Sequence, residues 1–238
     1  MKSNPLETSV LNPEITITAD EVDLHGELAV PSGARGVVLF AHGSGSSRHS
    51  PRNQYVARVL HEAGIGTLLF DLLTREEEEE DTGVFRFDIK LLAKRLLDAT
   101  LWLENQAQAR GLMLGYFGSS TGGGAALMAA AALGERIAAV VSRGGRPNLA
   151  GAALANVKCP ALLVVGGLDD VVIQLNEQAL VKLRCEKELR IVPGATHLFG
   201  EPGKIGEVAH ISADWFRTHM TDKARGGGSQ GVWERTRR

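Results

Sequence analysis

The chain has 238 residues, of which 44% are hydrophobic and 23% are charged, a length and balance typical of one large α/β domain with a sizeable core. Its formal net charge of −2 at pH 7 argues against a nucleic-acid partner and against binding to an anionic membrane. The two cysteines, Cys159 and Cys185, provide neither a disulfide framework nor a metal cluster and are typical of a cytoplasmic protein. Residues 1–14 lack the apolar core of a signal peptide, and no apolar run approaches the roughly 18 residues of a membrane span.

Short apolar runs alternate with amphipathic segments along the chain. The first two runs, residues 15–18 and 24–30, alternate apolar and polar side chains and predict an antiparallel hairpin. Buried strands are then expected at residues 36–41, 67–70, 112–114, 137–141, 161–165 and 189–192. Helices are expected from Pro51 to a stop at Gly64 and at residues 88–106, 125–132, 176–183 and 205–220. This alternation predicts a doubly wound, mostly parallel sheet in a single α/β domain of residues 1–220, followed by a flexible tail at 221–238.

Residues 112–126, LMLGYFGSSTGGGAA, contain the pattern Gly118-x-Ser120-x-Gly122 between an apolar run and an alanine-rich segment. A strand, a tight turn and a helix form the context in which this pattern indicates a nucleophile elbow. The glycines remove Cβ atoms that would collide in the turn. The helix start behind Ser120 offers unpaired backbone N–H groups and a positive dipole end. Ser120 is therefore the predicted nucleophile.

A serine hydroxyl becomes a good nucleophile only when a base, usually a histidine oriented by an acid, takes its proton. The order Ser120, Asp169, His197 is the order of these groups in α/β-hydrolases. Each residue follows a predicted strand, and parallel strands end at one edge of a sheet. We expect His197 to be the base and Asp169 the acid. Asp170 is the alternative acid, although a helix-capping or solvated role explains it as well.

Six other histidines compete with His197 for the role of base. His49 lies near the same edge and is a reserve candidate, whereas His42 is expected to brace its loop rather than to carry a proton. Surface or capping roles are expected for His25, His61, His210 and His219.

Two backbone N–H groups are needed to stabilise the oxyanion that forms during acyl transfer. One is expected from Thr121, the residue after the nucleophile, and the other from Ser44 in the loop after the strand at 36–41.

Charged residues also fall on the edge where the predicted strands end. Arg143 and Arg146 follow the strand at 137–141. They are explained either by ion pairs with nearby carboxylates or by a clamp that binds a carboxylate of the substrate. Arg143 is the candidate substrate-binding residue. Glu76 to Glu80 are expected to form a solvated loop, which would disfavour anionic substrates if it faced the site.

Five segments, HGSGSS, GYFGSSTGGGAA, SRGGRP, GGLDD and GATHLF, together resemble the dienelactone hydrolase-like branch of the α/β-hydrolase superfamily. More narrowly, they are similar to its serine hydrolases that occur beside or fused to phosphoribosyltransferase domains. The resemblance covers about residues 36–216 and implies an α/β-hydrolase fold without cofactor or metal, with Ser120, Asp169 and His197 as triad. Dienelactone hydrolase itself uses a cysteine nucleophile, so the resemblance does not extend to dienelactone as substrate.

Only residues 142–160 separate the strands at 137–141 and 161–165, where many α/β-hydrolases insert a lid. We therefore expect no lid domain and an open site suited to short acyl groups. The sequence predicts a serine hydrolase that cleaves a small-molecule carboxylic ester or lactone through an acyl-enzyme. The alternatives are a thioesterase or acyltransferase with the same triad, and a catalytically silent scaffold that binds a small molecule or a partner.

Overall fold

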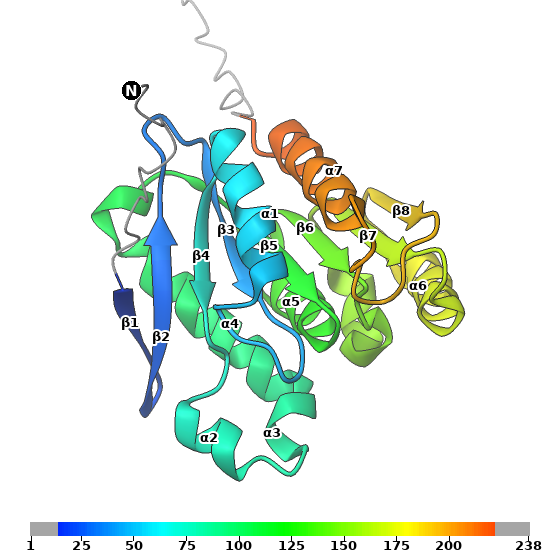
Figure 1. Cartoon of the computed structure of the whole chain (residues 1–238). Helices are drawn as coiled ribbons and strands as arrows, with labels where there is room; N and C mark the ends of the chain where they lie inside the picture. The colour runs from blue at the N-terminus through cyan, green and yellow to red at the C-terminus, as the bar shows by residue number, and fades with distance from the viewer. Residues whose placement is uncertain (1–13, 222–238) are drawn as a thin grey trace, which may run out of the picture.

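The structure is a computed structural model that describes residues 14–221. Within this range eight strands form one sheet, in the spatial order β1-β2-β4-β3-β5-β6-β7-β8 (Figure 1). The strands are β1 (Glu14–Ala19), β2 (Val22–Ala29), β3 (Gly36–Ala41), β4 (Gly66–Phe70), β5 (Met113–Ser119), β6 (Ile137–Arg143), β7 (Ala161–Gly166) and β8 (Lys187–Val192).

The sheet is antiparallel at its N-terminal edge and parallel elsewhere. β1 pairs with β2, and β2 with β4, in antiparallel register, whereas all pairs from β4 through β3 to β8 are parallel. The expected mostly parallel sheet with an N-terminal antiparallel hairpin is confirmed. The carboxyl ends of the parallel strands meet at the lower edge of the molecule in Figure 1.

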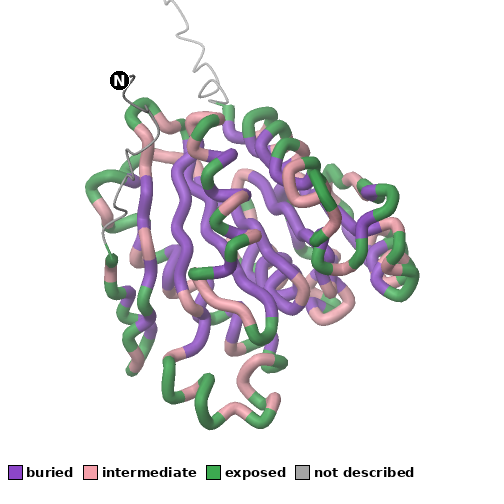
Figure 2. Tube along the Cα trace, viewed as in Figure 1, coloured by how far each residue is buried: buried purple, intermediate pink, exposed green. Residues whose placement is uncertain are grey.

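Helices cover both faces of the sheet, as a doubly wound fold requires. They are α1 (Pro51–Glu62), α2 (Arg75–Glu80), α3 (Val84–Phe87), α4 (Ile89–Glu104), α5 (Thr121–Leu133), α6 (Asp170–Lys182) and α7 (Lys204–His219), with short 3₁₀ helices η1 (Ala107–Ala109), η2 (Gly134–Arg136) and η3 (Pro147–Asn156). α1 and α7 pack on one face, and α4, α5 and α6 pack on the other. The central strands between these layers are buried along their length (Figure 2), which explains their continuous apolar runs.

The glutamates at 76–80 are solvated as predicted, with none of them buried, but the prediction of a loop is wrong, because Arg75–Glu80 forms helix α2. Thr74 and Glu77 make a capping box, in which the Thr74 hydroxyl accepts from the Glu77 N–H and the Glu77 carboxylate accepts from the Thr74 N–H. Arg75 also pairs with Glu79 one turn later. Carboxylates near the N-terminus of a helix are stabilised by its dipole, so a run of glutamates starts this helix rather than preventing it.

Several predicted boundaries also shift. β5 continues to Ser119 instead of ending at Leu114, since both of its glycines stay within the strand and let neighbouring groups approach closely. α6 begins at Asp170, six residues before the expected start at Asn176. The short helix α3 was not expected at all.

The segment between β6 and β7 is fully described and contains η3, which packs against α5 and α6 through buried Pro147, Ala150 and Leu154. It forms no lid over the carboxyl edge, as predicted. The expected tail at 221–238 lies, except for its first residue, outside the described residues. Within the described range, no helix combines the length and the apolar character needed to cross a membrane.

Candidate active site

Ser120 lies at the sharp turn between β5 and α5. Its backbone has φ 50° and ψ −120°, a region that residues with a Cβ atom rarely adopt and that costs about 1–3 kcal/mol. A Cβ atom at Gly118 would collide with the backbone of Gly122 and Gly123, and one at Gly122 would collide with the backbone at the end of β3. The spacing of the glycines is therefore required by close backbone contacts, and the turn has the backbone shape of a nucleophile elbow.

The structure brings Asp169 and His197 into direct contact. The distance between His197 Nδ1 and Asp169 Oδ2 is 2.6 Å, and both side chains are partly shielded from solvent. Asp169 directly precedes α6, yet its carboxylate caps no helix N–H, so it is available to orient the imidazole. Asp170 instead occupies the first turn of α6 and is exposed.

Ser120 and His197 lie on either side of the turn that follows β6. The Ser120 N–H donates to the carbonyl of Arg143 (3.2 Å), and the Arg146 N–H donates to the carbonyl of Ser120 (2.9 Å). A Cβ atom at Gly144 would lie 3.2 Å from the carbonyl oxygen of His197 and 3.6 Å from its Cε1. Among residues 14–221 no hydrogen bond joins the Ser120 hydroxyl to His197, and such bonds often tighten only when substrate is bound.

The two expected oxyanion donors, Ser44 and Thr121, are neighbours. The Ser44 N–H donates to the side-chain oxygen of Thr121 at 2.9 Å, and Thr121 is buried. The preceding residue, Gly43, packs against Ser120, because a Cβ atom at Gly43 would lie 3.0 Å from the Ser120 Cβ. The loop after β3 therefore lies directly against the elbow. In this arrangement the Ser44 N–H is already hydrogen-bonded to the Thr121 side chain.

The model of the dienelactone hydrolase family matches residues 24–221. The chain belongs to the dienelactone hydrolase family. The crystal structure of a dienelactone hydrolase from Anabaena variabilis is 56% identical, has a TM-score of 0.86, and is matched over 88% of this chain and 98% of that chain. The structure of Est1E from Butyrivibrio proteoclasticus is 15% identical over 87% of this chain and 98% of its own, with a TM-score of 0.73, and supports the α/β-hydrolase fold alone.

Curated relatives of this dienelactone hydrolase family member are longer than the chain. Two proteins of Mycobacterium tuberculosis, which carry a provisional phosphoribosyl transferase name, are 55% identical over 207 residues. That match covers 87% of this chain but 46% of each relative, so the chain spans about half their length. The resemblance to the dienelactone hydrolase branch is confirmed, and with it membership in a hydrolase family.

In this dienelactone hydrolase family member, His42 connects the ends of β3 and β4. Its Nδ1 lies 3.0 Å from the Gly43 carbonyl, and the Leu72 N–H donates to its Nε2 at 2.9 Å. An Nε2 that accepts this bond carries no proton, so the ring is neutral with its proton on Nδ1. Burial lowers the pKa of His42, although the Gly43 carbonyl and Asp71 oppose this shift. These contacts are those of a residue that braces its loop.

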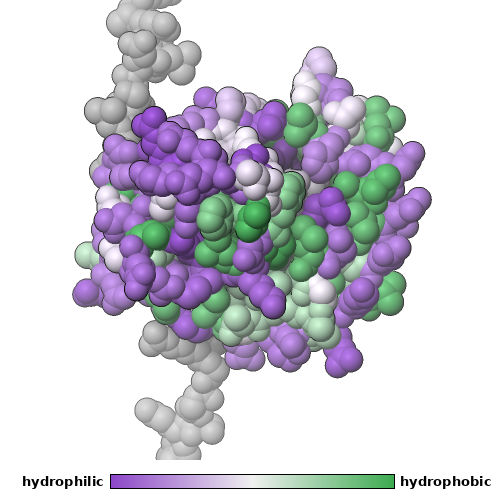
Figure 3. Space-filling model, turned by 90° about the horizontal axis from the view of Figure 1, so that it is seen from below, coloured by the Kyte–Doolittle hydropathy of each residue, from purple (hydrophilic) through white to green (hydrophobic). Residues whose placement is uncertain are grey.

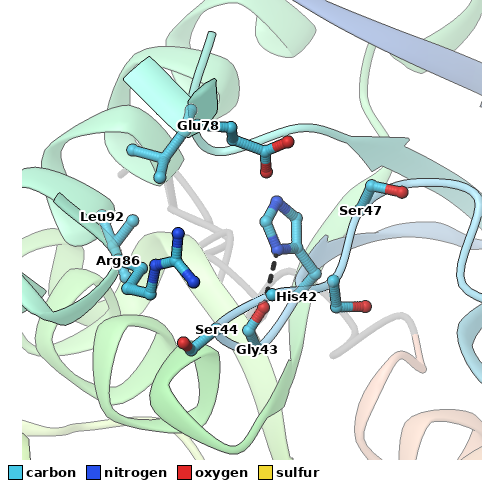
Figure 4. Close-up of a pocket in the computed structure, with 10 residues that line it drawn as sticks. His42, Gly43, Ser44, Ser47, Glu78, Arg86 and Leu92 are labelled. Atoms are coloured by element: carbon cyan, nitrogen blue, oxygen red, sulfur yellow. Dashed lines mark hydrogen bonds between the residues drawn. The ribbon is translucent and has the colours of Figure 1, made fainter. Parts of the chain in front are cut away.

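A pocket of about 260 Å³ lies beside the Ser44 loop. Figure 4 shows Glu78 and Arg86 pointing into it across from His42 and Ser44. Burial and nearby Asp71 raise the pKa of Glu78, while Arg86 opposes this shift. The Arg86 guanidinium pairs with Asp81, which also accepts backbone N–H groups of this turn. The pocket therefore has a carboxylate and a paired guanidinium on the side of α2 and α3.

The two arginines and the other histidines are the remaining predicted candidates. Arg143 is buried at the end of β6, whereas Arg146 is half-buried and its Nε lies 3.4 Å from the Asn148 side-chain oxygen. His49 lies 3.8 Å from Glu27 at the antiparallel edge. The other four histidines contact groups outside the site or none at all in the described chain, namely His25, His61, His210 and His219. No group of three or more metal-binding side chains was found among residues 14–221.

Sequence reasoning placed Glu78 at this edge only as one of five glutamates, and it missed the pocket residue Arg86. The overlooked signal was the capping box of Thr74 and Glu77, a local pattern that predicts the start of a helix. A helix at these residues fixes the direction in which the Glu78 side chain projects. Sequence reasoning also missed Arg52, which lies in the first turn of α1 near Arg143. No local pattern identifies Arg52, because its position depends on how α1 packs on the sheet.

Proposed function

We propose that this member of the dienelactone hydrolase family is a serine hydrolase that cleaves carboxylic esters or lactones through an acyl-enzyme. The observation that carries the proposal is the strained backbone of Ser120, combined with the 2.6 Å hydrogen bond between Asp169 and His197 at the same edge of the sheet. A serine held in this conformation lowers the stability of the fold, and such strain is characteristic of functional turns.

The proposed reaction begins with attack of the Ser120 oxygen on the substrate carbonyl. His197 takes the hydroxyl proton and returns it to the leaving alcohol, and Asp169 keeps Nδ1 protonated and stabilises the imidazolium. The N–H groups of Thr121 and Ser44 stabilise the tetrahedral oxyanion. Water, deprotonated by His197, then releases the acid from Ser120. For the Ser44 N–H to contribute, it must exchange the Thr121 side-chain oxygen for the oxyanion.

Two features support a short or exposed acyl group. The pocket beside the Ser44 loop, which the three proposed triad residues do not line, is small, about 260 Å³, and lies below the lower limit of about 300 Å³ for typical ligand sites. Apolar side chains surround the carboxyl edge, which Figure 3 shows from below with green patches between hydrophilic areas. The exposed apolar residues near this edge are Val84, Phe87, Leu168, Val171 and Leu198. The proposed substrate is a small molecule with an apolar part. We place the reaction in the cytoplasm, where two unpaired cysteines are typical.

The test is the intact mass of the protein after reaction with a fluorophosphonate. An activated Ser120 attacks phosphorus and expels fluoride, so one phosphonyl group should be added to the wild type and none to Ser120→Ala. Ser119→Ala is the matched control, because it removes the adjacent hydroxyl, which is buried in β5. It should still be labelled. A folded wild type that gains no mass, or labelling that persists in Ser120→Ala, would contradict the proposal. An ester panel ordered by acyl length then defines the substrate.

A further inference from the structure

Strand β8 ends the sheet on the side opposite the antiparallel hairpin. It pairs with β7 on one side, and among residues 14–221 no strand pairs with its other side, which lies at the outer edge of the sheet in Figure 1. β7 is buried along its whole length, whereas β8 is buried at Val192 only. An open edge of this kind presents unpaired N–H and C=O groups to which a second chain can add a strand.

The register with β7 decides which backbone groups of β8 point outward. The Ala161 N–H donates to the Glu186 carbonyl (2.9 Å), and the Gly167 N–H donates to the Val192 carbonyl (2.8 Å). Even-numbered residues of β8 therefore direct their backbone groups toward β7, because the hydrogen-bonding direction alternates along a strand. The odd-numbered residues direct theirs to the open edge, namely Lys187, Leu189 and Ile191.

The side chains of β8 divide between the two faces of the sheet. Glu188 and Arg190 lie on the face that α7 covers, where they border a pocket of about 390 Å³ next to Trp215. Within one chain these two residues pair with each other along the strand. On the opposite face Leu189 packs against the core on the α6 side. Ile191 is 45% exposed and is the one large apolar side chain exposed on a strand of the described chain.

An antiparallel second copy of β8 has one register in which these features match. When a two-fold axis passes through Leu189, the two copies of this residue can exchange both backbone hydrogen bonds, and Lys187 can do the same with the partner's Ile191. Glu188 then lies opposite the partner's Arg190 in a non-hydrogen-bonded pair, where Cα atoms are about 4.5 Å apart and side chains come closest. The symmetry repeats this pair, so the axis relates two ion pairs.

The other registers lack this match. An axis through Lys187, Glu188 or Arg190 places two like charges opposite each other, which is destabilising. An axis through Ile191 forms no ion pair, and an axis between two residues would oppose outward backbone groups to inward ones. The charges of β8 therefore select the axis through Leu189.

We propose that this protein forms a two-fold dimer in which two copies of β8 pair antiparallel about Leu189 and join the two sheets into one. A second copy fits because the outward backbone groups and the charges at positions 188 and 190 are self-complementary. The aliphatic stem of the partner's Lys187 would cover Ile191. The dimer would also remove the open edge that a single chain exposes. This inference does not depend on the proposed hydrolase function.

The test is the mass in solution, measured by sedimentation velocity from micromolar to near-millimolar protein. The mass should rise with concentration from 25.4 kDa toward twice that value. Glu188→Arg replaces both ion pairs by like pairs and should raise the dissociation constant of the dimer at least about tenfold. Arg190→Glu should have the same effect. The double variant Glu188→Arg with Arg190→Glu should restore the wild-type constant, because the charges only exchange places.

Glu62→Arg is the matched control. Glu62 is exposed at the end of α1, outside β8, and the substitution changes the net charge by the same amount as Glu188→Arg. Its dissociation constant should equal that of the wild type. Thermal melting shows that each variant is folded.

Hydrogen exchange followed by NMR locates the interface. The amides of Lys187, Leu189 and Ile191 should exchange more slowly as the wild type dimerises, and Glu188→Arg should remove this protection. A wild type that stays at 25.4 kDa at every concentration would overturn the dimer. A dimer that neither single variant weakens would place the interface elsewhere and overturn the proposal. Protection that is independent of concentration would also overturn it, because another part of the same chain would then cover the edge.

Discussion

The Ser44 N–H donates a hydrogen bond of 2.9 Å to the side-chain oxygen of Thr121, although both residues are expected to contribute backbone N–H groups to one oxyanion hole. The Thr121 oxygen thus occupies the hydrogen-bonding direction of Ser44 that a developing oxyanion would need. In the proposed reaction, binding of the oxyanion would have to break this internal bond. Thr121 would therefore reduce the net stabilisation that the Ser44 N–H can provide there.

Thr121→Val should increase affinity for a trifluoromethyl ketone, which forms a tetrahedral oxyanion adduct with serine hydrolases. The substitution keeps the shape and removes the competing acceptor, and the net value of one hydrogen bond, about 1 kcal/mol, corresponds to about fivefold in the inhibition constant. Thr121→Ser retains the acceptor and should match the wild type. Weaker inhibition of Thr121→Val would mean that the hydroxyl holds the loop in place rather than competing.

Ser120→Gly should be more stable than Ser120→Ala. Glycine adopts φ 50° and ψ −120° without steric cost, whereas alanine keeps the strain of the native serine. We expect the free energy of unfolding in urea to be about 1 kcal/mol higher for Ser120→Gly. At Ser119, which lies in regular strand β5, the glycine variant should instead be the less stable of the two. If the glycine and alanine variants have the same order of stability at positions 119 and 120, the elbow is not strained.

The central strands and the meeting of Asp169 with His197 could be predicted from the sequence for one reason. Continuous apolar runs such as residues 36–41 indicate parallel strands buried on both faces, and parallel strands end at one edge. Residues placed after different strands are then brought together by topology. The contact between Asp169 and His197 follows from strand order, even though 28 positions separate them in the sequence.

The environment of Arg143 could not be predicted in this way. In the sequence it is a charged residue at the end of a strand. Its aromatic neighbour Phe199 and the positive charge of Arg52, which acts on its pKa, come from distant segments. Helix α2 was missed for a different reason. Five consecutive glutamates suggested solvation, and the local capping box outweighed their mutual repulsion.

Stability should depend less on pH near neutrality when His42 is replaced. The pKa of this buried imidazole is lowered in the folded protein, so the unfolded chain binds more protons as pH falls through the ordinary histidine pKa. Stability is therefore lost on acidification from about pH 7 to 5, by at most about 1.4 kcal/mol per pH unit. Glutamine at position 42 can still accept the Leu72 N–H but does not titrate. If the plots of unfolding free energy against pH are parallel for the wild type and His42→Gln, the titration of His42 does not contribute to the pH dependence of stability.

Arg143→Met should be more stable than the wild type. The folded-state pKa of Arg143 is lowered to about 10, so the charged guanidinium destabilises the fold at every pH below that value, and the penalty disappears as pH rises above it. An apolar side chain of similar length avoids the penalty, and such replacements gain about 1–4 kcal/mol at buried ionic sites. Thermal melting at pH 7 measures the difference. A lower melting temperature would indicate that Arg143 stabilises the fold and is not held there for a ligand.

Asp81→Asn should loosen the turn between α2 and α3. The Asp81 carboxylate accepts from the N–H groups of Gly83 (2.7 Å), Phe85 (3.0 Å) and Arg86 (3.2 Å). Although burial raises its pKa, these bonds and the Arg86 side chain outweigh that effect and lower it to about 2. An amide has one acceptor oxygen and no charge, so it cannot form the ion pair with the Arg86 guanidinium.

Trypsin provides the measurement, because Arg86 itself is a cleavage site in this turn. Loss of bonds to a charged acceptor should make cleavage after Arg86 about tenfold faster under native conditions. Asp88→Asn is the control, since Asp88 caps α4 with bonds to Lys90 and Leu91 through a single oxygen, which an amide can replace. It should leave the cleavage rate after Arg86 near that of the wild type.

KM for short esters should rise in Asp81→Asn more than kcat falls, because the turn positions Arg86 at the pocket rather than at the reacting atoms. Equal cleavage rates in wild type and Asp81→Asn would mean that the α2–α3 turn is held by its apolar contacts and not by this carboxylate.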